Sequence, residues 1–220
     1  MPDVRFGAMS ENRQPQIQNP ESKIQNPKSA AAIFIDRDGT INEDLGYIST
    51  PEDLIVYPWV AEAVRLINEA GLKAIVVTNQ SGIARGSCTE DDLRRIHDRM
   101  TSELWREGAR IDAVYYCPHH PDYGDERYRR ECQCRKPQPG MLRAAAREHD
   151  IDLGRSWVIG DKASDINLAS AAGARGALVL TGYGGETLAY PDRWPCEPEL
   201  VADNLLDAVR RILDTRSQRR

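Results

Sequence analysis

The sequence lacks any long apolar run and has no surplus of basic residues. No stretch approaches the roughly 18 apolar residues of a membrane-spanning helix, and the first residues contain no apolar core of the kind that a secretory signal needs. The 29 Lys and Arg are outnumbered by 34 Asp and Glu, so the formal net charge is -5. No global positive field can therefore attract a nucleic acid backbone. We expect a cytoplasmic protein that binds neither membranes nor nucleic acid.

Cysteine is scarce, and its count is odd. Five cysteines without an export signal argue against a disulfide framework and direct attention to metal binding. The hydrophobic share of 40% and the charged share of 29% are typical of a globular protein. A length of 220 residues fits one α/β domain with a substantial core. The cysteines are Cys88, Cys117, Cys132, Cys134 and Cys196.

Residues 1–29 differ in composition from the rest of the chain. They contain four prolines, many Gln and Asn, and the tetrapeptide Ile-Gln-Asn-Pro twice. Apolar residues are too sparse there to offset the entropy lost on ordering, so we expect a disordered extension. Translation from a start at Met9 or later and a docking tail both remain open as explanations. The domain is expected to span residues 30–217.

After residue 30, short apolar runs alternate with amphipathic segments. This alternation predicts a doubly wound parallel sheet flanked by helices. In such a sheet, ligands bind at the carboxyl ends of the strands. Strands are predicted at 31–36, 72–78, 111–117, 157–161 and 176–181, and helices at 59–70, 89–107, 139–149, 164–172 and 200–213.

Three carboxylates are expected to meet at these strand ends. Asp36 and Asp38 follow the first strand, and Asp161 ends the fourth. An Asp at a single strand end is often only a turn former or helix cap. Three that converge repel one another unless a hard cation such as Mg²⁺ lies among them. A phosphate brought to that cation would be held by a hydroxyl, an amide and an ammonium, which Thr78, Asn79 and Lys136 supply.

These residues resemble, in order, the four motifs of the haloacid dehalogenase superfamily of phosphatases: Asp36-x-Asp38-Gly39-Thr40, Thr78, Lys136 and Gly160-Asp161-x3-Asp165. The resemblance implies a Rossmann-like fold and a covalent aspartyl-phosphate intermediate. It assigns Asp36 as nucleophile and, with the Asp38 carbonyl and Asp161, as a magnesium ligand. It assigns the side chain of Asp38 as acid and base, and Thr78 and Lys136 as phosphoryl-stabilising groups. Asp165 is expected to orient Lys162 or a metal-bound water.

The loop before Lys136 contains a second candidate metal site. Cys117-Pro118-His119 precedes the loop and Cys132-Gln133-Cys134 ends it. Three thiolates and one imidazole suit a closed, structural, tetrahedral Zn²⁺ site. The polar residues between them offer little core, so a metal is needed to order the loop. His120 competes with His119 as the fourth ligand, and we favour His119.

The zinc loop, residues 117–134, narrows the resemblance to the D-glycero-D-manno-heptose 1,7-bisphosphate 7-phosphatases and the related histidinol-phosphatase domains. Such a resemblance implies a small phosphorylated sugar as substrate, a monomer without a large cap domain, and zinc that holds Arg135 and Lys136 at the pocket rim. A bisphosphate requires a second anion site, for which Arg135 is best placed. Residues that the resemblance places at the substrate are Asp44, Leu45, Gly46, Tyr47, Thr78, Asn79, Gln80, Ser81, Arg135, Lys136 and Lys162.

Two other functions remain open on the sequence. A histidinol-phosphate phosphatase would use the same four motifs and differ only in its substrate loops. A catalytically dead binding module ordered by zinc would be expected to lack Asp36 or Asp161, and the chain retains both.

Overall fold

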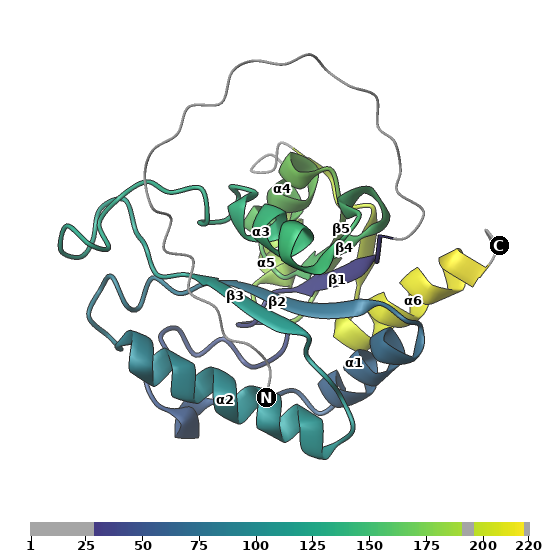
Figure 1. Cartoon of the computed structure of the whole chain (residues 1–220), viewed down its shortest axis with the longest axis horizontal. Helices are drawn as coiled ribbons and strands as arrows, with labels where there is room; N and C mark the ends of the chain where they lie inside the picture. Colours follow the sequence, from purple (N-terminus) through teal and green to yellow (C-terminus); the bar gives the residue numbers. More distant parts are fainter. Residues whose placement is uncertain (1–28, 191–195, 218–220) are drawn as a thin grey trace, which may run out of the picture.

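The computed structural model describes residues 29–190 and 196–217 (Figure 1). The disorder expected for residues 1–29 therefore falls, except for Ser29, outside the described residues. Within them, no helix combines the length and the apolar character that crossing a membrane requires.

Six parallel strands form one sheet in the order β3-β2-β1-β4-β5-β6. The order reverses next to β1, which lies between β2 and β4, so this is the switch point of a doubly wound sheet. The strands are β1 (Ala32–Ile35), β2 (Lys73–Asn79), β3 (Ala113–Cys117), β4 (Trp157–Gly160), β5 (Arg175–Val179) and β6 (Leu200–Ala202). The helices are α1 (Val60–Glu69), α2 (Glu90–Arg106), α3 (Gly140–His149), α4 (Ala163–Ala172), α5 (Gly184–Ala189) and α6 (Leu205–Ser217), with short 3-10 turns at Pro51–Asp53 and Leu153–Arg155.

Helices cover both faces of the sheet, giving three layers (Figure 1). Successive side chains of a strand point to opposite faces. Ile33 and Ile35 accordingly pack in the core shared with α1, α2 and α6. Ala32 and Phe34 pack in the second core, with α3 and α4. Because both faces of β1 are buried, its sequence is a continuous apolar run with no alternation.

Local signals explain where several helices begin and end. Thr89 caps α2 by accepting a hydrogen bond from the Asp92 backbone at 3.1 Å, and the Asp92 carboxylate accepts from the Thr89 backbone at 2.9 Å. This reciprocal pair satisfies two N–H groups that the first turn would leave unpaired. Gly173 follows α4 with φ +75°, a conformation that glycine adopts without steric cost.

One predicted element is wrong. Residues 200–213 were expected to form one helix, but Leu200–Ala202 form strand β6 and α6 begins at Leu205. Asn204 marks the boundary, because its side chain accepts a hydrogen bond from the Asp207 backbone at 3.1 Å, as an N-cap residue does. Pairing with β5 decides the conformation of the first three residues, and a helical pattern in the sequence does not encode that pairing. The sequence prediction also missed α5.

The connections at one edge of the sheet bring the candidate residues together. Between β1 and β2 the chain holds only the turn Pro51–Asp53 and α1. The loop from β3 to α3 is the longest irregular connection within the stretch 29–190. Both connections follow the carboxyl ends of strands, where ligands bind to a parallel sheet.

Candidate active site

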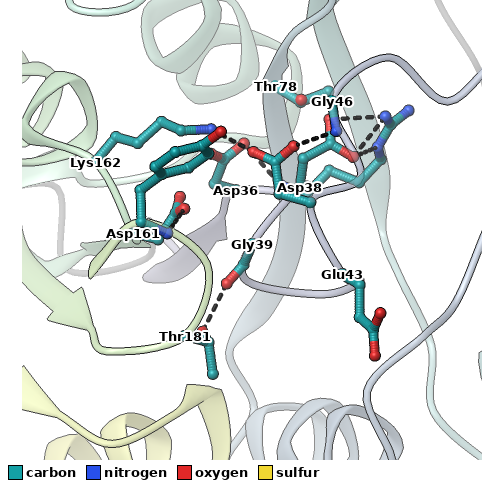
Figure 2. A network of polar contacts seen from close by, with 12 residues as sticks. Asp36, Asp38, Gly39, Glu43, Gly46, Thr78, Asp161, Lys162 and Thr181 are labelled. Atoms are coloured by element: carbon teal, nitrogen blue, oxygen red, sulfur yellow. Dashed lines mark hydrogen bonds and ion pairs between the residues drawn. The ribbon is translucent and has the colours of Figure 1, made fainter. Parts of the chain in front are cut away.

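Asp36 and Asp161 lie next to each other because β1 and β4 are neighbours. Ile35 pairs with Ile159 in the sheet, and the Asp36 backbone donates a hydrogen bond to the Ile159 carbonyl at 2.9 Å. Asp161 follows the last residue of β4 and is fully buried. Figure 2 shows the side chains of Asp36 and Asp161 close together, with Lys162 beside them. The expected convergence of these two carboxylates is therefore present.

A third carboxylate, Asp165, joins this pair from the first turn of α4. One oxygen from each of Asp36, Asp161 and Asp165 lies within 4.8 Å of the others, and all three residues are buried. Burial raises the pKa of Asp36 to about 6, helped by Asp165, and raises that of Asp161 to about 7, helped by Asp36. Oδ1 of Asp161 has no hydrogen-bond partner among the described residues. A buried carboxylate oxygen without a partner fits an oxygen-binding cation.

Lys136 supplies the fixed positive charge of this acidic cluster. Its Nζ lies 2.8 Å from Oδ1 of Asp36 and 2.6 Å from Oδ1 of Asp165, and it donates to the Val77 carbonyl at 3.2 Å. Burial alone would lower the pKa of Lys136, but the carboxylates of Asp165 and Asp36 raise it. Asp165 thus pairs with Lys136, and it also contacts the backbone of Lys162: its carboxylate accepts from the Lys162 N–H at 3.1 Å, and its own N–H donates to the Lys162 carbonyl at 2.9 Å. The expected contact of Asp165 with Lys162 is therefore present through the backbone, and the orientation of a metal-bound water by Asp165 stays a prediction.

Asp38 was expected to be the third carboxylate of this cluster, but its carboxylate is bound by Arg37, and Asp165 takes the third place. Arg37 donates to it at 2.6, 2.7 and 2.9 Å, and Asn42 and Gln80 add hydrogen bonds at 3.0 and 2.8 Å. Burial would raise the pKa of Asp38, but the Arg37 guanidinium and these hydrogen bonds hold it below its usual range. Asp36 and Asp38 therefore have different environments: in the metal-free chain, burial favours the protonated form of Asp36, and Arg37 favours the ionised form of Asp38.

The last residues of β2 and the residue after it connect the strand to Asp38 and Lys136. The Gln80 amide donates to Oγ1 of Thr78 at 2.9 Å as well as to Asp38. The Asn79 side chain accepts from the Lys136 backbone N–H at 3.0 Å and donates to its carbonyl at 3.3 Å. Thr78, Asn79 and Gln80 are thus tied to catalytic candidates, while Ser81 is partly exposed beside them. Gln80 thus links Thr78 to Asp38, and Asn79 links β2 to Lys136.

The predicted substrate loop, residues 44–47, is joined to the site by an ion pair. Lys162 Nζ lies 2.8 Å from Oδ2 of Asp44 and 4.8 Å from the centre of the Tyr183 ring. Burial alone would lower the pKa of Lys162, but the nearby carboxylates of Asp161 and Asp36 outweigh burial and raise it above its usual range. The Gly46 backbone donates to Asp44 at 2.9 Å, which shapes the turn. Leu45 and Tyr47, at 56% and 52% exposed, present apolar surface to solvent here.

Two glycines allow the strand ends to approach. Gly39 has φ +84°, and a Cβ at this position would overlap the Asp161 carboxylate. The Gly39 carbonyl accepts a hydrogen bond from Thr181 at 2.6 Å, visible in Figure 2. A Cβ at Gly160 would overlap the Asp165 carboxylate. Glycine is therefore required at both positions for the acidic cluster to form.

A second candidate metal site lies at the ends of the zinc loop. The sulfur atoms of Cys117, Cys132 and Cys134 lie 3.3 to 3.5 Å apart, and Nδ1 of His119 lies 3.3 Å from the Cys134 sulfur. Ligands about 2.3 Å from a tetrahedral Zn²⁺ would be separated by about 3.8 Å, close to this spacing. His120 lies outside the cluster: its Nδ1 accepts from the Asp122 backbone at 3.1 Å. The donor set fits a closed zinc site.

Arginines from outside the zinc loop contact residues within it. Arg135 donates to the His119 carbonyl at 3.0 Å. Arg85, from the segment after β2, lies 3.6 Å above the ring of Tyr123 and 5.7 Å from that of Tyr47, with its Nη2 3.4 Å from Nε2 of His120. The Arg85 guanidinium thus links the predicted substrate loop to the zinc loop.

Sequence reasoning missed three residues of this region: Arg37, Arg85 and His97. Arg37 lies between two motif aspartates, and its place in that tripeptide was the only local signal. Arg85 belongs to none of the motifs and had no assigned role. His97 is on α2, far from the motifs in sequence, yet its Nε2 lies 3.4 Å from Nη1 of Arg37. No local pattern could have shown that contact.

Comparison with known proteins agrees with this geometry. A family model described as HAD-hydrolase-like matches residues 133–208. The chain is 44% identical over 182 residues to the D-glycero-D-manno-heptose-1,7-bisphosphate 7-phosphatase of Thermosynechococcus vestitus, covering 81% of this chain and 93% of that one. It is 43% identical over 157 residues to the D-glycero-beta-D-manno-heptose-1,7-bisphosphate 7-phosphatase of Escherichia coli K12, covering 71% and 82%.

A solved structure shows the same fold. The D,D-heptose 1,7-bisphosphate phosphatase of B. bronchiseptica, complexed with magnesium and phosphate, superimposes with a TM-score of 0.75 at 36% identity, covering 84% of this chain and 99% of that one. A relative from Burkholderia mallei, 46% identical over 149 residues and covering 68% of this chain and 79% of that one, carries the alpha-anomer name. The relatives thus include both anomeric types. With the motif residues gathered at one edge of a parallel sheet, the chain belongs to the heptose-1,7-bisphosphate 7-phosphatase family of the HAD-like hydrolases.

Proposed function

We propose that the chain hydrolyses the C7 phosphate of D-glycero-D-manno-heptose 1,7-bisphosphate, with Asp36 as nucleophile. The observation that carries the proposal is the buried group of Asp36, Asp161 and Asp165 around Lys136 at the switch point of the sheet. A buried acid cluster held by one lysine is expensive to build and has no role in packing. Its cost is explained if it binds a cation and a phosphate.

Asp36, Asp161 and the Asp38 carbonyl would hold Mg²⁺, which the partnerless Oδ1 of Asp161 fits. When bound, Mg²⁺ supplies charge neutralisation for the phosphoryl oxygens. Lys136 and the Thr78 hydroxyl would bind the phosphoryl group and stabilise its charge in the transition state. An attack by Asp36 splits one slow hydrolysis into two faster steps.

Asp38 would handle the protons of both steps. It gives a proton to the leaving sugar oxygen and later takes one from the attacking water. Its carboxyl group is separate from the acid cluster, so it need not bind the cation through its side chain. Asp165 would hold Lys136 in place.

Substrate selection would fall to the substrate loop, residues 44–47, and to the zinc loop, since only a 3-10 turn and α1 lie between β1 and β2. Lys162, Asp44 and the exposed Tyr47 form one side of the site. Arg135, which donates a hydrogen bond to the His119 carbonyl, would form the other. Zn²⁺ on Cys117, His119, Cys132 and Cys134 would fix this rim, and Arg135 would bind the C1 phosphate.

The test is a kinetic panel of the two heptose 1,7-bisphosphate anomers and histidinol phosphate, with ³¹P NMR to identify the phosphate released. The proposal predicts highest kcat/KM on a heptose bisphosphate and release from C7. Arg135→Gln should raise KM for the bisphosphate by about tenfold or more, as expected for loss of a charged hydrogen bond, and leave KM for p-nitrophenyl phosphate nearly unchanged. Higher efficiency on histidinol phosphate would overturn the assignment of substrate.

A further inference from the structure

Arg37 is a buried arginine that neither the motifs nor the metal site explains. Its side chain is only 1% exposed, and it is among the largest fully buried side chains of the described residues. Burying a guanidinium is costly unless its donors are paired. The position of those donors therefore indicates what the residue contributes.

The guanidinium joins Asp38 to α2. Nε donates to Oδ1 of Asp38 at 2.9 Å, and Nη2 donates to Oδ1 at 2.6 Å and to Oδ2 at 2.7 Å. On the other side, Nη1 lies 3.4 Å from Nε2 of His97, which is also 1% exposed. Because a guanidinium can only donate, Nε2 of His97 is the acceptor. His97 thus accepts a hydrogen bond that holds the Arg37 guanidinium in place, and the guanidinium in turn holds the Asp38 carboxylate.

Among the described residues, Arg37 makes three of the five hydrogen bonds that the Asp38 carboxylate receives. The other two come from Asn42 and Gln80, single amides on two different segments. A bidentate arginine fork fixes both the position and the plane of a carboxylate, which a single amide cannot do. The orientation of Asp38 therefore depends mainly on Arg37.

We propose that Arg37, braced by His97, is a positioning residue that orients the Asp38 carboxyl group for proton transfer. This proposal rests on the proposed function, since it requires Asp38 to transfer protons. A small misplacement of a catalytic group can cost a large part of its effect. If Arg37 served folding alone, its substitution would lower stability, and any loss of kcat/KM would be the same for all leaving groups.

The proton balance shows which step depends on this placement. An oxygen of Asp36 forms a bond to phosphorus, the bond from phosphorus to the leaving oxygen breaks, and its electron pair takes the proton of the Asp38 carboxyl group. The five donors favour the ionised form of Asp38, so one of them must withdraw when Asp38 carries the proton that it gives. Water then attacks phosphorus, Asp38 takes its proton, and the Asp36 carboxylate is restored as phosphate leaves.

Substrates whose leaving groups differ in basicity distinguish a role of Arg37 in proton transfer from a role in folding alone. A p-nitrophenolate departs without a proton, whereas a sugar alkoxide requires one. For Arg37→Lys, which keeps the charge and loses the fork, kcat/KM on p-nitrophenyl phosphate should stay within about threefold of wild type, and on the heptose bisphosphate should fall by about 10²-fold or more. Phenyl phosphate should fall between the two. An equal loss on all three would overturn the proposal.

Lys73→Met is the matched control, because Lys73 makes an ion pair of 3.0 Å with Asp112 at the opposite end of β2. It should lower stability without changing the order of substrates. If Arg37→Lys does not fold, His97→Leu and His97→Gln replace it: only the leucine, which removes the acceptor, should make the loss grow with leaving-group basicity. A uniform loss in His97→Leu would contradict the proposal. A wild type that cleaves none of the three phosphates would instead refute the proposed function.

Discussion

Lys136 Nζ lies 2.8 Å from Oδ1 of Asp36, and this ion pair is buried on both sides. The same ammonium lies 2.6 Å from Asp165, so one cation serves two carboxylates. Asn79 fixes its backbone with two hydrogen bonds. The positive charge that the proposed phosphoryl transfer needs is therefore held beside Asp36 by contacts within the chain.

Lys136→Met should reduce both stability and activity. It leaves two buried carboxylates without their cation, and breaking a buried pair in this way costs about 3–5 kcal/mol. Urea denaturation without Mg²⁺ measures this loss, and kcat/KM on p-nitrophenyl phosphate measures the activity. Lys73→Met, which breaks a part-exposed pair, should cost about 1 kcal/mol or less and keep full activity. Equal losses of stability in the two variants would contradict the account.

The stabilisation by Mg²⁺ should increase with pH. Burial raises the pKa of Asp36 from 3.8 to about 6 and that of Asp161 from 3.8 to about 7. In the metal-free chain these groups therefore contribute stability that is complete below about pH 4 and is lost as pH rises through about 6 to 7. Mg²⁺ replaces the bound protons, so its increase in Tm should be small at about pH 5 and largest above about pH 7.

Thermal unfolding with Mg²⁺ and with EDTA, repeated across this pH range, checks this expectation. Asp161→Asn removes one of the two titrating groups and should flatten the pH dependence. An increase in Tm that is the same at all pH values would show that Mg²⁺ does not bind at these carboxylates.

Loss of zinc should loosen the zinc loop and leave the sheet intact. Cys132→Ser removes one of the four clustered ligands, and binding of a structural metal supplies the free energy that orders its loop. We expect faster amide hydrogen exchange across residues 117–134, higher KM, and an unchanged exchange pattern in β1 and β4. Cys196→Ser, outside the cluster, is the control. Metal analysis that finds no zinc in protein purified without chelators would contradict the assignment.

Gly160→Ala should disrupt the acidic cluster through steric overlap alone. Its Cβ would overlap Asp165, which must then move away from Lys136. We expect kcat/KM to fall by about 10²-fold, in line with the cost of a misplaced catalytic group. Gly185→Ala is the matched control, because its Cβ would meet nothing within 4 Å, and it should change neither activity nor fold. Full activity in Gly160→Ala would mean that the position of Asp165 does not matter.

The sequence predicted the parallel sheet and its strand ends well, for a physical reason. Strands buried on both faces read as apolar runs, and each run stops where a polar residue meets the carboxyl edge. Asp36 and Asp161 could be placed on this basis, because neighbouring parallel strands end at the same edge. The Cys117 to Cys134 cluster was predictable from residue type and spacing.

The remaining contacts depend on side-chain partners from distant elements. Asp165 was expected to orient Lys162 or a metal-bound water, and its ion pair with Lys136 across the site was not predicted. His97 reaches Arg37 because α2 packs in the same core as β1. Strand β6 was missed because three residues carry too little pattern to outweigh the adjoining helix. Periodicity and motif spacing contain no information about these pairings.

The central claim, that Asp36 is the nucleophile, is tested most directly by trapping the phosphoenzyme. Rapid acid quench during turnover of the heptose bisphosphate, followed by mass spectrometry of the peptides, should find the phosphoryl group on Asp36. Asp38→Asn, which lacks the base for the second step, should accumulate more of this species on p-nitrophenyl phosphate, and Asp36→Asn should form none and lose on the order of 10⁴-fold or more in kcat. A phosphoryl group on another residue, or activity retained by Asp36→Asn in a preparation free of other phosphatases, would contradict the account.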